Sequence, residues 1–291
     1  MNTRSCLLFV LLLIVFASCQ KEFSIDTTNL GTSSGNGNAV LVSKIVMMVG
    51  SDTSTVGEFR YDSVNRPVYI KNTSIDTFGQ KTIQEYIITR NSAGNITQFT
   101  TQVTDPAVGV VVTNTTVHYP SGSSNFDYRL TKSVNAGVTI IDSVVYTYNG
   151  NKVATLTDYY GDGVSPYSQL ASATYNYDGN GNITTVSMNY PTSVLNNGVL
   201  SDLVYSYQYD SKNNPTNFGN DLMLLFGDEV AKNNFVSLQI KAPNPTPSSF
   251  GLNESITYTY LSNGYPATAT MKSVSVNPDD TTVGNITYYY Q

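Results

Sequence analysis

The chain is poor in residues that commonly carry catalytic chemistry. Its 291 residues include no tryptophan and one histidine, and only 12% of them are charged. A serine-type catalytic triad would have to use His118, which lies between Val117 and Tyr119 in a strand-like run, and the sequence has no G-x-S-x-G motif. We therefore expect His118 to be structural. The missing tryptophan also weakens the case for an aromatic carbohydrate-binding platform.

Positive charge is scarce as well. The chain has 15 Lys and Arg against 21 Asp and Glu, for a formal net charge of −6. Nucleic-acid binding requires basic side chains grouped on one surface, where they neutralise phosphates. Here the basic residues are scattered along the sequence, so we expect no nucleic-acid partner.

The longest apolar run lies at the N-terminus and is short. Residues 6–16 are 11 apolar residues preceded by Arg4, whereas a membrane-spanning helix needs about 20. This pattern predicts a signal peptide over residues 1–18. Its removal also removes Cys6, which leaves Cys19 as the single cysteine of the mature chain. An intrachain disulfide and a cysteine-based metal site or thiol catalyst are thereby excluded.

The residues at the predicted cleavage site also indicate a lipid anchor. Phe16, Ala17, Ser18 and Cys19 resemble a bacterial lipobox, in which the signal is cut before a cysteine that becomes lipidated. The resemblance implies an outer-membrane anchor at Cys19, and several acyl chains hold a protein stably without a membrane-spanning segment. Residues 20–22 (Gln-Lys-Glu) resemble the export tags of Bacteroidota surface lipoproteins. Ordinary secretion remains the alternative. Residues 19–39 are rich in Ser, Thr, Gly and Asn and predict a flexible tether.

The remaining residues, 40–291, have the composition of a single all-β domain. Tyr, Thr, Ser, Asn and Val are abundant, and no helical heptad is present. Residues 175–186 give the clearest unit: tyrosines alternate with small polar residues, a run from Asp178 to Asn182 predicts a tight turn, and apolar alternation then resumes. The step of three from Ile183 to Val186 predicts a bulge, or an isoleucine that belongs to the turn.

This hairpin is repeated along the chain. The residue before the turn recurs at intervals of 29 residues and then at wider spacing, and these positions are Tyr61, Arg90, Tyr119, Tyr148, Tyr177, Tyr209, Tyr260 and Tyr290. Arg90 replaces the tyrosine in its copy. A repeat of this length indicates supersecondary units that bury a face only against their neighbours. We predict 14–17 antiparallel strands in a meander that forms a large curved sheet or a barrel.

The motif Tyr-x-Tyr-Asp-x-x-Gly-Asn is similar to the YD repeats of Rhs-type proteins. With the lipobox, the degenerate copies resemble uncharacterised Bacteroidota lipoproteins with YD-like repeats, including the family of unknown function DUF4595. The resemblance covers about residues 56–290 and implies a porin-like fold. It implies no activity, because the family has none established. A porin-like shape also leaves open whether a pore exists.

One segment breaks the period, from about residue 217 to residue 253. Residues 220–231 predict a short helix capped by Asn220 or Asp221. Its apolar residues would be unfavourable in water, so we expect them to pack on the sheet as a plug. A lid or partner-docking element is the functional alternative, and the candidate residues are Leu222, Leu224, Leu225 and Phe226.

Three groups of residues could support other functions. Carboxylate pairs suited to glycosidic hydrolysis are Asp158 with Asp162, Asp228 with Glu229, and Asp279 with Asp280. All occur in turn-like contexts, where Asp has a backbone role. Asp178, Asn180 and Asn182 match the start of a calcium loop, but position 189 is Asn rather than the required Glu. The 22 tyrosines suit cross-strand ladders as well as a binding surface.

We therefore expect a non-enzymatic envelope lipoprotein without a cofactor or metal. It would act as a scaffold or binding module for an extracellular polymer, a protein or an apolar ligand. A hydrolase that uses loop carboxylates and a carrier that holds an apolar molecule inside the curved sheet are the alternatives.

Overall fold

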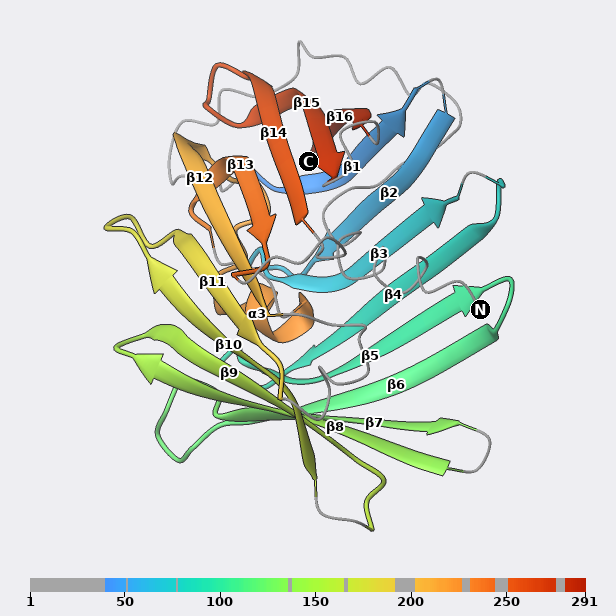
Figure 1. Cartoon of the computed structure of the whole chain (residues 1–291), viewed down its shortest axis with the longest axis vertical. Coiled ribbons are helices and arrows are strands. Elements are labelled where there is room, and N and C mark those ends of the chain that lie inside the picture. Colours follow the sequence, from blue (N-terminus) through green and yellow to red (C-terminus); the bar gives the residue numbers. More distant parts are fainter. Residues whose placement is uncertain are drawn as a thin grey trace.

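The computed structural model describes residues 40–291 apart from 51, 77, 136–137, 165–166, 192–201, 227–230, 244–250 and 276–280. Within these residues, sixteen strands form a closed antiparallel barrel in which each strand pairs with its neighbours in sequence (Figure 1). The last strand pairs with the first from Val42 opposite Tyr290 to Val49 opposite Gly284, which closes the ring. The predicted all-β meander and its strand number are confirmed, and of the two predicted shapes the barrel is the one observed.

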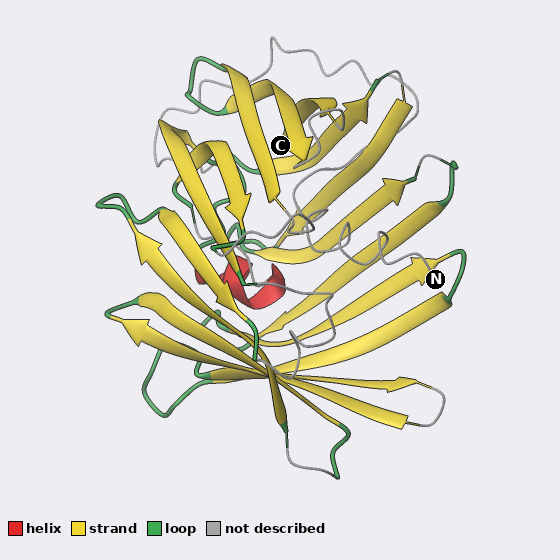
Figure 2. Cartoon of the chain, in the orientation of Figure 1, coloured by secondary structure: helices red, strands yellow, loops and turns green. Residues whose placement is uncertain are grey.

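The strands have similar lengths. They are β1 (Val42–Val49), β2 (Asp52–Tyr61), β3 (Pro67–Ile75), β4 (Lys81–Arg90), β5 (Ile96–Asp105), β6 (Gly109–His118), β7 (Tyr128–Asn135), β8 (Val138–Asn149), β9 (Lys152–Gly161), β10 (Ser168–Tyr177), β11 (Ile183–Asn189), β12 (Leu203–Asn213), β13 (Asn233–Lys241), β14 (Gly251–Tyr260), β15 (Pro266–Ser275) and β16 (Thr281–Tyr290). A single helix among the described residues, α3 (Asn220–Phe226), joins β12 to β13 (Figure 2).

The repeated turns are built by the aspartate of the motif. Oδ1 of Asp178 accepts hydrogen bonds from the backbone N–H groups of Asn180 (2.8 Å) and Asn182 (2.9 Å), which holds the reversal. The register then shifts between Asn176 and Tyr177, so a bulge follows the turn as the sequence predicted. The same shift precedes Tyr61, Arg90, Tyr148 and Tyr260.

Four of the repeated tyrosines connect their strand to the start of an earlier strand through a hydrogen bond. The Tyr177 hydroxyl donates to the carbonyl of Val153, at the start of the preceding hairpin's second strand, over 2.8 Å. Equivalent bonds run from Tyr209 to Ile183, from Tyr290 to Pro266 and from Tyr61 to Val42. The last of these joins β2 to the first strand. These bonds join neighbouring strands at the end of the barrel that carries the repeated turns. We call it the helix end, because α3 also lies there.

The inner and outer faces of the barrel differ in polarity. Inward side chains form one continuous apolar cluster that includes Ile70, Phe99, Tyr146, Ile240 and α3 residues. Outward side chains on the same strands are mostly polar. They include Glu58, Lys71, Thr100, Thr174, Asn176, Asn253, Thr257, Thr259, Thr268, Thr270 and Lys272, and several pair with one another, such as Thr259 with Thr268 at 2.6 Å. Apolar residues interrupt this polar surface, singly as at Ile87 and in pairs as at Tyr128 with Val145 and at Val110 with Val112.

The segment that breaks the repeat is smaller than predicted. The expected helix is present but described only over Asn220–Phe226, and the residues that follow lie partly outside the described chain. The predicted insertion over 217–253 also contains β13, a regular member of the meander that pairs with β12 and β14. The wider spacing between Tyr209 and Tyr260 therefore reflects α3 and its connections. Spacing alone could not separate a strand from the loop around it.

Candidate ligand site inside the barrel

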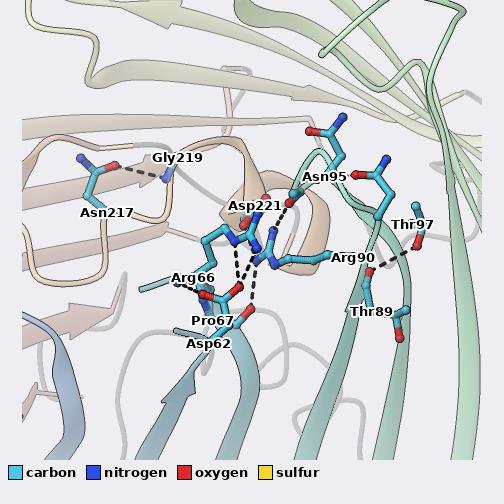
Figure 3. A network of polar contacts seen from close by, with 12 residues as sticks. Asp62, Arg66, Pro67, Thr89, Arg90, Asn95, Thr97, Asn217, Gly219 and Asp221 are labelled. Atoms are coloured by element: carbon cyan, nitrogen blue, oxygen red, sulfur yellow. Dashed lines mark hydrogen bonds and ion pairs between the residues drawn. The ribbon is translucent and has the colours of Figure 1, made fainter. Parts of the chain in front are cut away.

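Arg90 fixes α3 inside the helix end of the barrel. Its Nη2 atom lies 2.6 Å from Oδ2 of Asp221 and also donates to the carbonyl of Pro67 over 2.9 Å, while Nη1 donates to Gly94 over 3.0 Å (Figure 3). The Arg90 side chain is 7% exposed, so the ion pair is largely screened from water. Arg90 occupies the tyrosine position of its repeat. It keeps the bond to the preceding strand and adds a charged contact to the helix.

A second arginine holds the other side of α3. Nη1 of Arg129, on β7, donates to the carbonyl of Leu224 over 2.6 Å. Met223, Leu224 and Leu225 are buried, and the Phe226 ring packs edge-on against Tyr86 with centroids 5.0 Å apart. The sequence-predicted apolar residues of this segment thus lie inside the barrel, although the side chain of Leu222 is outside the described part. α3 therefore packs against the apolar inner wall.

A cluster of polar side chains lies on the inner wall beside Arg129. Asp142 and Tyr146 come from β8, and Asp158 comes from β9. Asp158 is opposite Val144, which places it diagonally across from both β8 residues on the same face. Tyr146 is 4% exposed. Buried polar atoms of this cluster without a hydrogen-bond partner are the Tyr146 hydroxyl, Nε of Arg129 and one Oδ1 atom each of Asp142 and Asp158.

The burial of this cluster shifts its protonation equilibria. Burial, together with the neighbouring Asp142, raises the pKa of Asp158 to about 6, and Arg129 opposes this shift. Burial also raises the pKa of Asp142, and the positive charge of Arg129 again opposes the shift. Burial lowers the pKa of Arg129, but Tyr146, Asp142 and Asp158 outweigh it, so the net direction is upward. The two acids therefore interact electrostatically, and the protonation of one affects the pKa of the other.

The end of the barrel opposite α3 remains accessible from inside. Val111 pairs with Val103 and Tyr160 pairs with Asp142, both on the inward face, yet Val111 is 44% exposed and Tyr160 is 47% exposed. These exposures show that, among the described residues, solvent reaches this part of the inner wall. We call this end of the barrel the open end; its turns include the one that joins β9 to β10. The Asp142 and Asp158 side chains lie between the open end and α3.

His118 has the structural surroundings that the sequence indicated. It is exposed at the end of β6, its Nδ1 atom lies 2.6 Å from Oδ1 of Asp127, and its ring stacks on Tyr128 with centroids 4.7 Å apart. Those contacts fix the connection between β6 and β7. The Asp142–Asp158 cluster does not include it.

Of the three candidate carboxylate pairs, only Asp158 with Asp162 lies within the described residues, and these two acids do not face each other. Asp158 faces the interior, whereas Asp162 caps the turn by accepting from the N–H of Val164 over 2.9 Å. Asp228, Glu229, Asp279 and Asp280 lie outside the described residues. The pair that the structure forms, Asp142 with Asp158, was missed. A signal existed: a two-residue turn at Gly150 followed by the repeat's bulge fixes the register of β8 against β9, and this register brings the two acids to one face.

The calcium-like run at Asp178 and several of the repeat tyrosines have structural roles. The Asp178 side chain is engaged by the turn, and in the described chain no three His, Cys, Asp or Glu side chains group as metal ligands. The hydroxyls of Tyr61, Tyr177, Tyr209 and Tyr290 donate to backbone carbonyls, whereas that of Tyr260 bonds to Asp210. The predicted signal peptide, Cys19 and the tether all lie outside the described residues. No helix in the described part of the chain is long and apolar enough to cross a membrane.

One comparison with a solved structure supports the architecture. No family model matches the chain, and no curated protein matches it. Among solved structures, a porin-like protein from Bacteroides uniformis aligns with a TM-score of 0.54 and 16% identity, over 86% of this chain and 98% of its own. A porin-like protein from Bacteroides vulgatus aligns with a TM-score of 0.43 and 13% identity, over 87% and 99%. The first likeness shows that the chain has a porin-like fold.

Proposed function

We propose that this chain is a lipid-anchored envelope protein whose barrel binds a ligand in its interior and stands outside the bilayer. The polarity of the two barrel faces is the observation that carries this proposal. A membrane-spanning barrel needs a continuous outward apolar band about 25 Å tall, whereas outward positions here carry mainly Thr, Ser, Asn, Gln, Lys and Glu, with fewer apolar residues such as Ile87, Val110 and Val145 among them. The buried apolar residues and the buried tyrosines face inward. Kinship with YD-repeat lipoproteins is part of the same proposal.

The interior favours a polar ligand over an apolar one. Met223, Leu224 and Leu225 of α3 occupy the apolar part of the barrel, so a carrier of a large apolar molecule would have to displace the helix. The accessible part lies toward the open end, where Asp142, Asp158 and Tyr160 line the wall. Phe78, Val108 and Val164 are exposed on turns around that end and could contact an extracellular partner.

Conductance in planar lipid bilayers tests the absence of a channel. The purified protein that starts at residue 20 is expected to produce no discrete current steps, because its outer face lacks the apolar band that insertion requires. A Bacteroides porin of known conductance serves as the positive control. Reproducible single-channel currents from this protein would contradict the proposal.

A hydrolase is the second candidate, because two acids converge inside the barrel. Asp158 has a pKa of about 6, as a general acid would need, and Asp142 lies diagonally across from it on the next strand. These acids differ from the predicted loop pairs. A screen of chromogenic glycosides with the wild type and with Asp158→Asn tests this function: hydrolysis by the wild type that the variant loses would establish it. Absence of turnover with the whole panel favours the binding role.

A further inference from the structure

The Asp142–Asp158 cluster carries more negative charge than the surrounding chain neutralises. Neither carboxylate has a hydrogen bond or an ion pair in the described part of the chain, and one oxygen of each is buried without a partner. On β7, Thr131 is the residue opposite Asp142, but its hydroxyl pairs with Thr115 at 2.8 Å. Buried carboxylates normally have partners because their desolvation is costly.

Arg129 supplies one positive charge for two acids. Its Nη1 atom is engaged by the Leu224 carbonyl of α3, and it forms no ion pair with either aspartate. The other titratable groups that act on the two acids and on Arg129 are the tyrosines Tyr146, Tyr86 and Tyr190, which are neutral at physiological pH. With both acids ionised, the cluster therefore has a net charge of about −1.

The aromatic side chains of this wall suit a cation of low hydration. Tyr146 lies on the same strand and face as Asp142, and Tyr160 is its cross-strand partner. Tyrosine ring faces attract cations, most strongly organic ammonium groups that are readily desolvated. Calcium instead needs six to eight oxygen ligands, and no group of three ligating side chains occurs among the residues described.

We propose that Asp142 and Asp158 form a binding site for the ammonium group of a small organic cation that enters through the open end. The inference rests on the proposed binding role of the interior and specifies its ligand class. The positive charge of the ammonium group would neutralise the negative charge that Arg129 leaves uncompensated. Its N–H groups would donate hydrogen bonds to the two carboxylates. A proton on Asp158 competes for the same charge, so binding weakens as the pH falls.

Calorimetric titration of the intact barrel with ethylammonium and with tetramethylammonium tests the site. Ethylammonium is expected to bind at pH 7.5 and to lose about tenfold in affinity at pH 5, because a group with a pKa of about 6 is then about nine-tenths protonated. Tetramethylammonium has no N–H group to donate, so it is expected to bind more weakly, with the same pH dependence. Asp158→Asn should reduce binding at pH 7.5 at least tenfold. Asp105→Asn is the matched control: Asp105 is bonded to Thr82 and to its own turn, so binding should stay within twofold.

The remaining outcomes separate this inference from the proposed function. Binding of a neutral polyol such as xylitol, without binding of either ammonium probe, would overturn the cation site and leave an interior binding role in place. Binding of ethylammonium that Asp158→Asn does not weaken would place the cation elsewhere and overturn the assignment. Failure of every probe to bind would mean that water and a bound proton are the partners of the two carboxylates. That result would contradict both the cation site and the proposed binding role of the interior.

Discussion

At the scale of residues, the tyrosine and aspartate of the repeated motif have separate tasks. Asp178 closes its own turn through two backbone N–H groups, whereas the hydroxyl of Tyr177 reaches back to Val153 of the preceding strand. The first task is local and the second joins neighbouring units. Burial raises the pKa of Tyr177 to about 12, so its hydroxyl remains a donor at any physiological pH.

Tyr177→Phe tests the contribution of the hydroxyl bond. The variant keeps the ring and removes the donor to Val153, so the free energy of unfolding should fall by about 1 kcal/mol. Urea denaturation measures this loss. Tyr159→Phe provides the control, because Tyr159 lies on the outward face opposite Ser143 and should change stability by less than about 0.5 kcal/mol. Equal effects of the two substitutions would argue against the bond.

Asp158 should give the protein an unusual pH dependence. Its folded pKa of about 6 is above the ordinary value of 3.8, so the folded state binds a proton more tightly than the unfolded state. Stability from this group is therefore present at low pH and is lost as the pH rises from about 4 to about 6. Asp178 and Asp105 have lowered pKa values, and their contribution is lost only below this window.

Asp158→Asn is expected to flatten the fall in stability between pH 4 and pH 6. The variant removes a buried charge, so at pH 7.5 it should be more stable than the wild type, by about 1 kcal/mol after allowance for partial exposure. Thermal unfolding across this pH range measures the change. Asp105→Asn should leave the profile between pH 4 and 6 unaltered. An unchanged profile in Asp158→Asn would show that Asp158 titrates normally.

At the scale of elements, α3 is fixed by two arginines from distant strands. Arg90 lies 131 residues from Asp221, and Arg129 lies 95 residues from Leu224. The sequence predicted the helix from its cap and apolar residues, because those signals are local. It could not predict these arginine contacts, since they depend on which strands surround the helix after the barrel closes. Arg90 carried a weak signal, as the one repeat position where tyrosine is replaced by a charged residue.

Asp221→Ala tests the clamp on α3. The substitution leaves the guanidinium of Arg90, at 7% exposure, without its charged partner, so we expect a loss of about 3 kcal/mol in the free energy of unfolding. Hydrogen exchange of the α3 amides should accelerate more than exchange in β14 and β15. Lys71→Ala is the control, since Lys71 and Glu58 form an exposed pair at 3.6 Å that should be worth less than about 0.5 kcal/mol.

At the scale of the whole molecule, the hairpin repeat was predictable and its closure was not. Turn chemistry at Asp178 and the tyrosine spacing specify a meander of antiparallel strands. Whether the first strand meets the last depends on the accumulated twist of sixteen strands, which no single turn encodes. The pairing of Val42 with Tyr290 settles that question. It also gives the chain an inside and an outside, and thereby places Asp142 and Asp158 in the interior.

The most direct test of the account is where the full-length protein is found in cells when Cys19 is replaced by alanine. A barrel with a polar outer face and a lipid anchor should sediment with the membrane fraction as the wild type. Cys19→Ala should release it into the soluble envelope fraction, with the barrel still folded by circular dichroism. Retention of Cys19→Ala in membranes after a carbonate wash would contradict the account, because the barrel itself would then be embedded in the bilayer.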